Sequence, residues 1–427
     1  MTEKERTRLE LAMAMIEARK EKQRKEGMPE LDYEYHIKMA PIKMWLNGAI
    51  FPKKSAVLLG NTTREDIAEM TKSNPGIFAP AHRGIYDASR LYAHIVPHSI
   101  IVTGDEKAFY GTILHPLLKI WGTRFFDRLD SWDGAMIIEA VSHDIFNSQS
   151  ILWFPEGAVN THNQKMLPLY LGIIKIALNA DASIFPIGNE IHIIRNQKKD
   201  KIVRDINYFM YEDYSQGQKP YRPSDDVSLA QMHKKFKDIS YKDAVQNYDI
   251  ESFISGTNFE LGNIKFNLED ELALLLQSHM IINDFCNEVK ASNNTAAVEH
   301  IKRYLMRCAV INNLNKRRVA CLNILNERMQ ILSDKIIAEI HRRHPMSEAD
   351  RVRNHAEYAE YYLEKVVKIG KKGKTDIYIE SDQYHNRKTE EEIISKESAK
   401  ILEGLKNIIK NDASFMRYKA YSQISIS

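Results

Sequence analysis

Short apolar runs alternate with amphipathic stretches between about residues 53 and 194, and this is the clearest pattern along the chain. Five runs have strand length and are bounded by glycine, proline or asparagine: AVLLG (56–60), GIFAP (76–80), SIIVTG (99–104), SILWFPEG (150–157) and ASIFPIGNEI (182–191). AMIIEAVSHDIF (135–146) and LGIIKIALN (171–179) have the apolar period of helices. The alternation predicts an α/β domain with a mostly parallel sheet flanked by helices.

The pattern changes after the polar, proline-containing stretch YSQGQKPYRPSDD (214–226), which is typical of a linker. Beyond it the apolar period is mainly helical. Its clearest stripe, of the kind that forms a helix-bundle core, consists of Leu325, Met329, Leu332, Ile336 and Ile340. We therefore expect three parts: a basic N-terminal helix over 1–30, the α/β domain over 31–213, and a mainly α-helical region of unknown role over 227–427.

Charge and cysteine content narrow the class of protein. Lys and Arg total 60 against 57 for Asp and Glu, so the net charge of +3 does not indicate a nucleic-acid binder. Cys286, Cys308 and Cys321 are odd in number and lack the paired spacing of zinc or redox sites. They are typical of buried thiols in a reducing compartment, which favours the cytoplasm.

The N-terminal segment bears on membrane contact. No stretch approaches the ~18 consecutive apolar residues of a membrane-spanning helix, and residues 1–27 lack a signal-peptide pattern. That segment has apolar residues at one end and an Arg/Lys/Glu run at the other. It suits either an anionic membrane surface or docking on its own domain.

Candidate chemistry begins at His82, which follows an apolar run and precedes Asp87 by five positions. Alone, this pair is better explained by a histidine at a helix start that bonds a loop carbonyl. Three more blocks follow at expected strand ends: GTRFFDR (122–128), FPEG (154–157) and FPIG (185–188). In this order, over roughly 77–191, the blocks resemble the signature of the glycerolipid acyltransferase superfamily, which includes lysophosphatidic acid acyltransferases.

The resemblance implies a reaction and a general base. His82 would remove the proton of an acceptor hydroxyl, and Asp87 would fix the imidazole tautomer and stabilise the imidazolium. No serine or cysteine stands in a nucleophile position nearby, so the acceptor itself would attack an acyl thioester. The donor would be acyl-CoA or acyl carrier protein as co-substrate, without another cofactor.

The resemblance also implies substrate-binding residues. Arg128 would hold an acceptor phosphate, although its neighbours Asp127 and Asp130 equally suit a surface ion pair. The other expected substrate-binding residues are Gly122, Phe126, Phe154, Pro155, Glu156 and Gly157. The Pro-Glu-Gly stretch is also typical of a turn that ends a strand. A metal site built from His82, Glu156, Glu190 and His192 is disfavoured, because their spacing matches no known ligand pattern.

The chain departs from the superfamily pattern at several positions. Ala81 and Gly84 stand where Asn and Ser are usual, and Ala158 and Val159 replace the Thr and the second phosphate-binding Arg. Acyl transfer is therefore a firmer inference than a glycerol-phosphate acceptor. Either another cation compensates, with Lys165 preferred over Arg124, or the acceptor carries less negative charge, which we favour.

The resulting hypothesis is a cytoplasmic enzyme, peripheral on the membrane face, that acylates a hydroxyl of a lysoglycerolipid or related membrane lipid. The alternative is a catalytically weak relative that binds lipid or acts as a scaffold. Nucleic-acid binding is disfavoured, since its basic runs, NKRR (315–318), HRRH (341–344) and KIGKKGK (368–374), are short and scattered. The sequence does not specify the acyl chain length, the acceptor or the oligomeric state.

Overall fold

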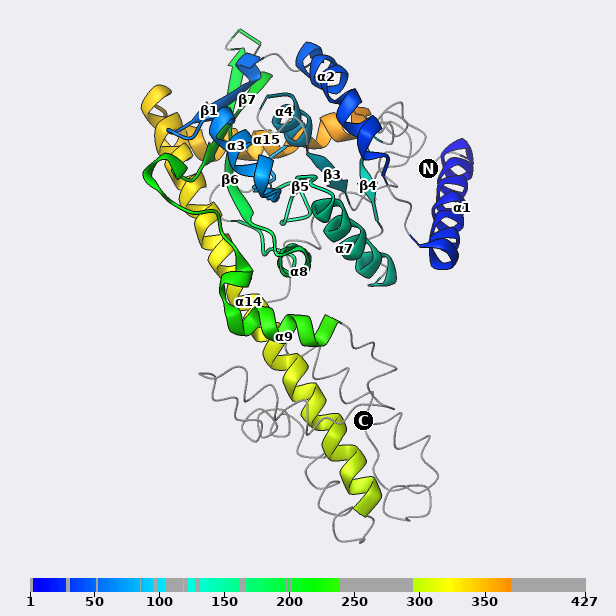
Figure 1. Cartoon of the computed structure of the whole chain (residues 1–427). Coiled ribbons are helices and arrows are strands. Elements are labelled where there is room, and N and C mark those ends of the chain that lie inside the picture. The colour runs from blue at the N-terminus through cyan, green and yellow to red at the C-terminus, as the bar shows by residue number, and fades with distance from the viewer. Residues whose placement is uncertain are drawn as a thin grey trace. The chain divides into compact units, whose positions relative to one another are not determined.

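The computed structural model describes residues 3–27, 31–50, 53–84, 86–94, 99–103, 118, 122–126, 131–160, 166–196, 198–199, 201–237 and 295–369 (Figure 1). The chain forms two compact units. One comprises residues 1–224 and 321–387, and the other comprises 225–320 and 388–427. The expected linker lies at the boundary and contains two short 3₁₀ helices, η2 (Tyr214–Gln216) and η3 (Pro223–Asp225).

The first unit contains a seven-stranded sheet in the order β1-β7-β6-β2-β5-β3-β4. Its strands are β1 (Ala56–Leu59), β2 (Ile77–Pro80), β3 (Ile100–Thr103), β4 (Arg124–Phe125), β5 (Ile151–Trp153), β6 (Ile184–Asn196) and β7 (Lys201–Tyr211). Neighbouring strands pair in parallel, apart from β6 and β7. The predicted α/β fold with a mostly parallel sheet flanked by helices is confirmed.

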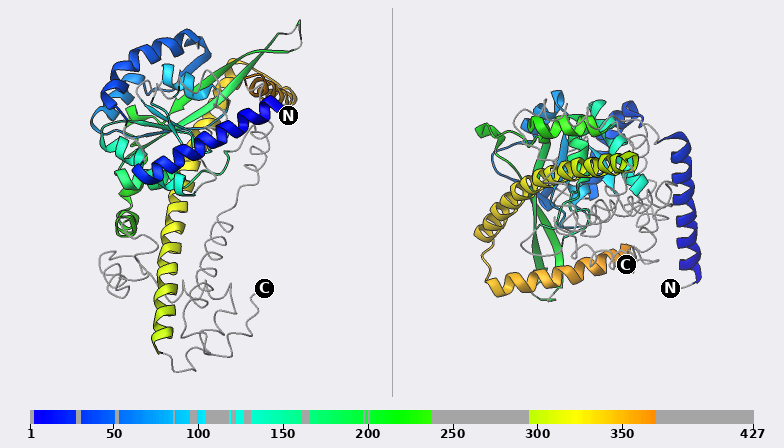
Figure 2. Two further views of the ribbon diagram at one scale, coloured as in Figure 1. Left: turned by 90° about the vertical axis from the view of Figure 1, so that its right-hand side faces the viewer. Right: turned by 90° about the horizontal axis from the view of Figure 1, so that it is seen from below.

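Strand β7 is not among the five predicted strand runs, and neither is the short strand β4. Together with β6, which continues past the expected end at residue 191, β7 forms a long antiparallel hairpin. Figure 2 shows that the far end of this hairpin projects beyond the other strands. The hairpin matters for the site because it places Asn207 of β7 within hydrogen-bond distance of Asp87, in the segment that follows β2.

Helices cover both faces of the sheet. On one face, α2 (Tyr33–Ile50), α3 (Arg64–Ser73) and α4 (Asp87–His94) contribute to a core in which Phe78 of β2 packs against Phe185 of β6. α7 (Ser131–Phe146) and α8 (Gly172–Ala180) lie side by side, where the sequence predicted helices. A 3₁₀ turn, η1 (Lys53–Ser55), leads into β1.

Part of the C-terminal helical region packs directly on the sheet. α14 (Thr295–Arg343) carries the predicted apolar stripe, whose five residues are all buried. A Cβ at Gly188 of β6 would lie 2.7 Å from the Leu332 Cβ, so glycine permits this close approach. α15 (Glu348–Ile369) follows, whereas α9 (Val227–Lys237) belongs to the second unit. The three-part domain division stays a prediction, but residues 321–387 belong to the same compact unit as the sheet.

The N-terminal helix α1 (Glu3–Glu26) docks on its own unit. Its Arg19 makes a 3.0 Å ion pair with fully buried Asp133 in the first turn of α7, and Ile16 is buried. This contact agrees with the second of the two interpretations of the segment. Within the described part of the chain, no helix is both long and apolar enough to cross a membrane.

Candidate active site

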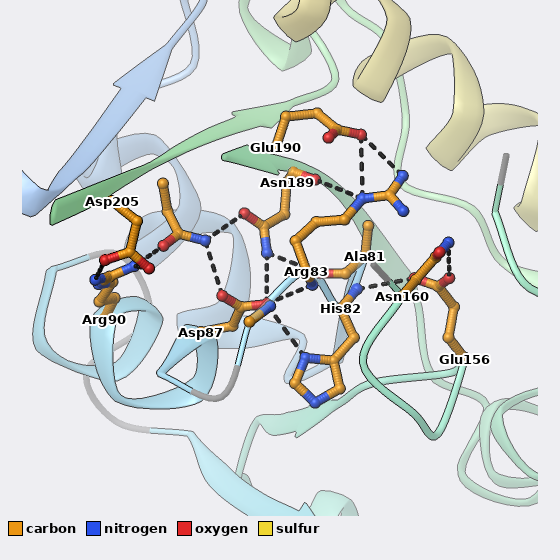
Figure 3. Close-up of polar contacts among 12 residues, drawn as sticks. Ala81, His82, Arg83, Asp87, Arg90, Glu156, Asn160, Asn189, Glu190 and Asp205 are labelled. Atoms are coloured by element: carbon orange, nitrogen blue, oxygen red, sulfur yellow. Dashed lines mark hydrogen bonds and ion pairs between the residues drawn. The ribbon is translucent and has the colours of Figure 1, made fainter. Parts of the chain in front are cut away.

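His82 lies just past β2, and its backbone is bonded to the loop that follows β5. The His82 amide donates to Glu156 Oε1 at 2.8 Å, and the Asn160 amide donates to the His82 carbonyl at 2.6 Å (Figure 3). β2 and β5 are parallel neighbours, so their carboxyl ends lie together at one edge of the sheet. This edge is where open α/β sheets bind ligands.

Asp87 starts α4 and is fully buried. Its Oδ2 lies 3.2 Å from His82 Nδ1 and also accepts bonds from the backbone amides of Arg83 (2.6 Å) and Gly84 (2.8 Å). The His82 side chain keeps 19% of its surface exposed. The structure thus brings the predicted pair together, with the carboxylate inside the protein and the imidazole at the surface.

Two asparagines that sequence reasoning missed complete the binding of Asp87. Asn189 Nδ2 donates to Oδ2 and Asn207 Nδ2 donates to Oδ1, both at 2.8 Å (Figure 3). Asn207 also donates to Asn189 Oδ1, so the amides orient each other. Arg90, which is ion-paired with Asp205, contacts Asn207 Oδ1. Asn189 directly follows FPIG and was within reach of motif analysis, whereas Asn207 lies on the unpredicted strand.

A buried ion pair supports the other side of the loop. Arg83 Nη2 lies 2.8 Å from Glu190 Oε1, and each side chain is about 5% exposed or less. Burial raises the pKa of Glu190 to about 7, although the Arg83 guanidinium opposes the shift. Arg83 therefore faces the protein interior and anchors the residue after His82 to β6.

Glu156, which the resemblance assigns to substrate binding, lies in the loop after β5 and contacts the backbone of His82. It is fully buried, and besides the His82 amide it accepts bonds from Asn160 Nδ2 (2.9 Å) and the Leu167 amide (2.8 Å). A carboxylate that accepts several protein donors holds those donors in place. Its observed contacts fix the backbone around His82.

Aromatic residues and two glycines shape the surroundings. The Phe154 ring centroid lies 4.2 Å from that of His82, and Phe126 stacks on Trp153 at 5.7 Å. Gly122 and Gly157 have φ of 75° and 63°, which favours glycine. The carbonyl of buried Pro155 accepts a bond from the Tyr170 amide. FPEG is therefore a turn at the strand end whose phenylalanine contacts the candidate base.

Only some of the candidate phosphate-binding residues lie in the part of the chain that the structure describes. Arg128 and Lys165 lie outside the described residues. Arg124 is buried in an ion pair with Asp144 at 2.6 Å, so its assignment as a compensating cation was wrong. Tyr33 donates to the same carboxylate, and burial, followed by this bond, raises the Tyr33 pKa to about 12. Ala158 and Val159 are both partly exposed.

Three residues of the disfavoured metal site have protein partners: His82 contacts Asp87, Glu156 accepts from Asn160, and Glu190 pairs with Arg83. His192 stacks on His344 with centroids 3.9 Å apart, and burial, followed by the charge of His344, lowers the His192 pKa to about 4. In the part of the chain that the structure describes, no cluster of three or more His, Cys, Asp or Glu residues suits a metal ion.

In two of the basic runs, arginines bond other residues of the protein. Arg318 of NKRR bonds His233, and burial lowers the Arg318 pKa to about 10. Arg342 and Arg343 of HRRH both pair with Glu339. Residues 370–374 of the third run lie outside the described residues. Of the cysteines, Cys321 is buried, Cys286 is not described, and only the backbone of Cys308 is described.

The fold and site together define a class: an α/β protein with a partly exposed histidine that is hydrogen-bonded to a buried aspartate at the carboxyl ends of parallel strands. Residues 61–190 match the family model described as acyltransferase, and they contain both members of the pair. Residues 61–190 therefore form an acyltransferase-like domain.

Comparison with other proteins adds little to this assignment. The chain is similar to the crystal structure of the 1-acyl-sn-glycerophosphate (LPA) acyltransferase PlsC from Thermotoga maritima, with 14% identity and a TM-score of 0.32, over 48% of this chain and 82% of that one. At that TM-score the likeness carries no argument. No curated protein matches the chain.

Proposed function

We propose that the protein transfers an acyl group from an acyl thioester to a hydroxyl of a lysoglycerolipid or related acceptor. The observation that carries this proposal is the His82–Asp87 pair inside an acyltransferase domain, with the carboxylate fully buried at Nδ1 and the imidazole partly exposed. Acyl-CoA or acyl carrier protein would supply the thioester. The acceptor site decides which acceptor is used.

The geometry suits general-base catalysis. With Nδ1 facing Asp87, the Nε2 atom is the one to take the proton from the acceptor hydroxyl. The hydroxyl oxygen then forms a bond with the thioester carbonyl carbon, the carbon–sulfur bond breaks, and His82 returns the proton to the thiol that leaves. Asp87 stabilises the transient imidazolium through its bond to Nδ1.

Incubation of the purified protein with a mixed acyl-thioester pool and a panel of lysolipids tests the proposal. Mass spectrometry should find a new ester and released thiol. His82→Ala should lower turnover by at least ~10²-fold while the protein stays folded. Absence of transfer by the wild-type protein would leave the lipid-binding or scaffold alternative. Near-normal turnover of His82→Ala would exclude this mechanism.

We further infer that the acceptor carries less negative charge than lysophosphatidic acid. The turn after Gly157 continues with Ala158 and Val159, which are uncharged, and Arg124 is taken up by Asp144. Losing one charge-assisted contact costs roughly 1.5–3 kcal/mol of phosphate binding. Competition between lysophosphatidic acid and a zwitterionic lysolipid should favour the latter, and Val159→Arg should lower the KM for the phosphate monoester. A preference for the monoester that Lys165→Ala abolishes would contradict this inference.

For membrane contact, helix α2 is a stronger candidate than α1. Its Trp45 is 71% exposed and Ile42 is 48% exposed, while α1 is docked through Arg19. Exposed tryptophan favours the lipid–water interface. Trp45→Ser should weaken sedimentation with anionic phospholipid vesicles, whereas Phe146→Ser, which removes an exposed aromatic from α7, should not. Equal binding of both variants would refute this role of α2.

A further inference from the structure

Helix α15 reaches the candidate catalytic loop from outside the acyltransferase domain. Its Tyr358 is 5% exposed, and the Tyr358 hydroxyl donates to the carbonyl oxygen of Arg83 at 3.3 Å. The preceding residue, Glu357, forms an ion pair with Arg195 of β6. Tyr358 is separated from Arg83 by 275 positions, and it lies well beyond residues 61–190.

The bond from Tyr358 acts on one particular peptide group. The carbonyl of Arg83 and the amide of Gly84 belong to the same planar unit, so fixing one end orients the other. That amide donates to Asp87 Oδ2, the oxygen that faces His82 Nδ1. A continuous chain of bonds thus runs from the Tyr358 hydroxyl through the peptide and the carboxylate to the imidazole.

The Tyr358 hydroxyl lies in the space that a side chain at position 84 would occupy. A Cβ at Gly84 would lie 2.9 Å from the Tyr358 hydroxyl oxygen and 3.2 Å from Asp87 Oδ1. The superfamily pattern usually has serine at this position. In this chain, the tyrosine oxygen occupies the volume beside the carboxylate that a larger residue 84 would need.

The hydroxyl is also held as a donor. Burial, followed by the charges of Asp205 and Asp87, raises the pKa of Tyr358 well above its ordinary value. It therefore remains protonated over the pH range in which an enzyme of this kind is assayed. Linked hydrogen bonds polarise one another, which strengthens the bond between Gly84 and Asp87.

We propose that Tyr358 is a positioning residue for the His82–Asp87 pair and that α15 is thereby a functional part of the acyltransferase. This inference rests on the proposed function. Tyr358→Phe removes the hydroxyl but keeps the ring. It should lower kcat by about 2- to 10-fold, the effect of one uncharged hydrogen bond, with little change in KM. Tyr208→Phe is the matched control: Tyr208 is also buried and its hydroxyl lies 3.3 Å from His344 Nε2, so loss of that hydroxyl should leave kcat unchanged.

A double-mutant cycle tests the spatial argument. Gly84→Ala should lower kcat in the wild-type background, because the new methyl group displaces the Tyr358 hydroxyl. In the Tyr358→Phe background that oxygen is absent, so the same substitution should cost less. Additive effects of the two substitutions on kcat would overturn the proposed link between residues 84 and 358.

A spectroscopic measurement separates this inference from the proposed function. In protein labelled with ¹⁵N-histidine, and with His82 assigned by His82→Gln, Tyr358→Phe should shift the ring-nitrogen resonances of His82 and Tyr208→Phe should not. An inactive wild-type protein that shows this shift would refute the proposed function alone. An active wild-type protein whose kcat and His82 resonances are both insensitive to Tyr358→Phe would refute the positioning role alone.

Discussion

Substitution of Asp87 by asparagine is the most informative single perturbation of the site. The carboxylate accepts five hydrogen bonds, from His82 Nδ1, two backbone amides and two asparagine side chains, and none of its surface is exposed. An asparagine side chain keeps one oxygen. If that oxygen takes the Oδ2 position, the new amide nitrogen faces the amide nitrogen of Asn207, so two donors meet. In the opposite orientation the new amide nitrogen faces the backbone amides of Arg83 and Gly84, which is worse because two donors lose their acceptor.

The magnitude follows from these contacts. One unsatisfied buried donor costs about 1–3 kcal/mol, and the remaining bonds lose their charge assistance, so Asp87→Asn should lower the free energy of unfolding by about 3–5 kcal/mol. Typical domains have ~5–15 kcal/mol, so the variant should still fold. Because the neutral side chain neither fixes the His82 tautomer nor stabilises the imidazolium, kcat should fall by about 10²- to 10⁴-fold.

The assay combines urea unfolding with initial rates of thiol release, corrected for the folded fraction. Asp144→Asn is the matched control, because Asp144 is an equally buried carboxylate whose contacts are to Arg124 and Tyr33. It should reduce stability but leave kcat per folded molecule unchanged. A folded Asp87→Asn protein with kcat within about threefold of wild type would refute the role of the carboxylate in positioning the base.

Three further predictions concern the surrounding structure. Glu156→Gln should lower the free energy of unfolding by about 1–3 kcal/mol, because its new amide group faces one of the donors that the carboxylate now accepts; an unchanged urea midpoint would contradict this. The folded-state pKa of Glu190, about 7, exceeds its ordinary 4.5, so the folded protein binds more protons between these values and stability should fall as pH rises through this window, by up to about 3 kcal/mol. Urea unfolding from pH 4 to 8 should show this fall in the free energy of unfolding, and the fall should be smaller in Glu190→Gln. An equal fall in both proteins would refute the raised pKa of Glu190. Gly188→Ala should destabilise the protein by about 1–3 kcal/mol through a clash with the Leu332 Cβ, and Leu332→Gly, which removes that Cβ, should partly relieve the clash in the double variant; fully additive losses would show that α14 does not pack there.

The sequence by itself determined the local elements and the candidate base. Periodicity depends on neighbours a few positions apart, so the runs at 76–80, 135–146 and 171–179 became β2, α7 and α8. His82 and Asp87 lie five positions apart on one loop and helix start, and their meeting needed little beyond local geometry. The buried stripe of α14 was likewise legible from its helical spacing.

Only the tertiary structure decided what surrounds that pair. Asn207 contacts Asp87 across 120 positions and depends on a hairpin that the sequence pattern did not reveal, while Tyr358 arrives across 275. Arg124 appeared available for phosphate until burial against Asp144 removed it. The physical reason is the same in each case: a buried polar group must find a partner in space, and sequence spacing does not tell which distant residue supplies it.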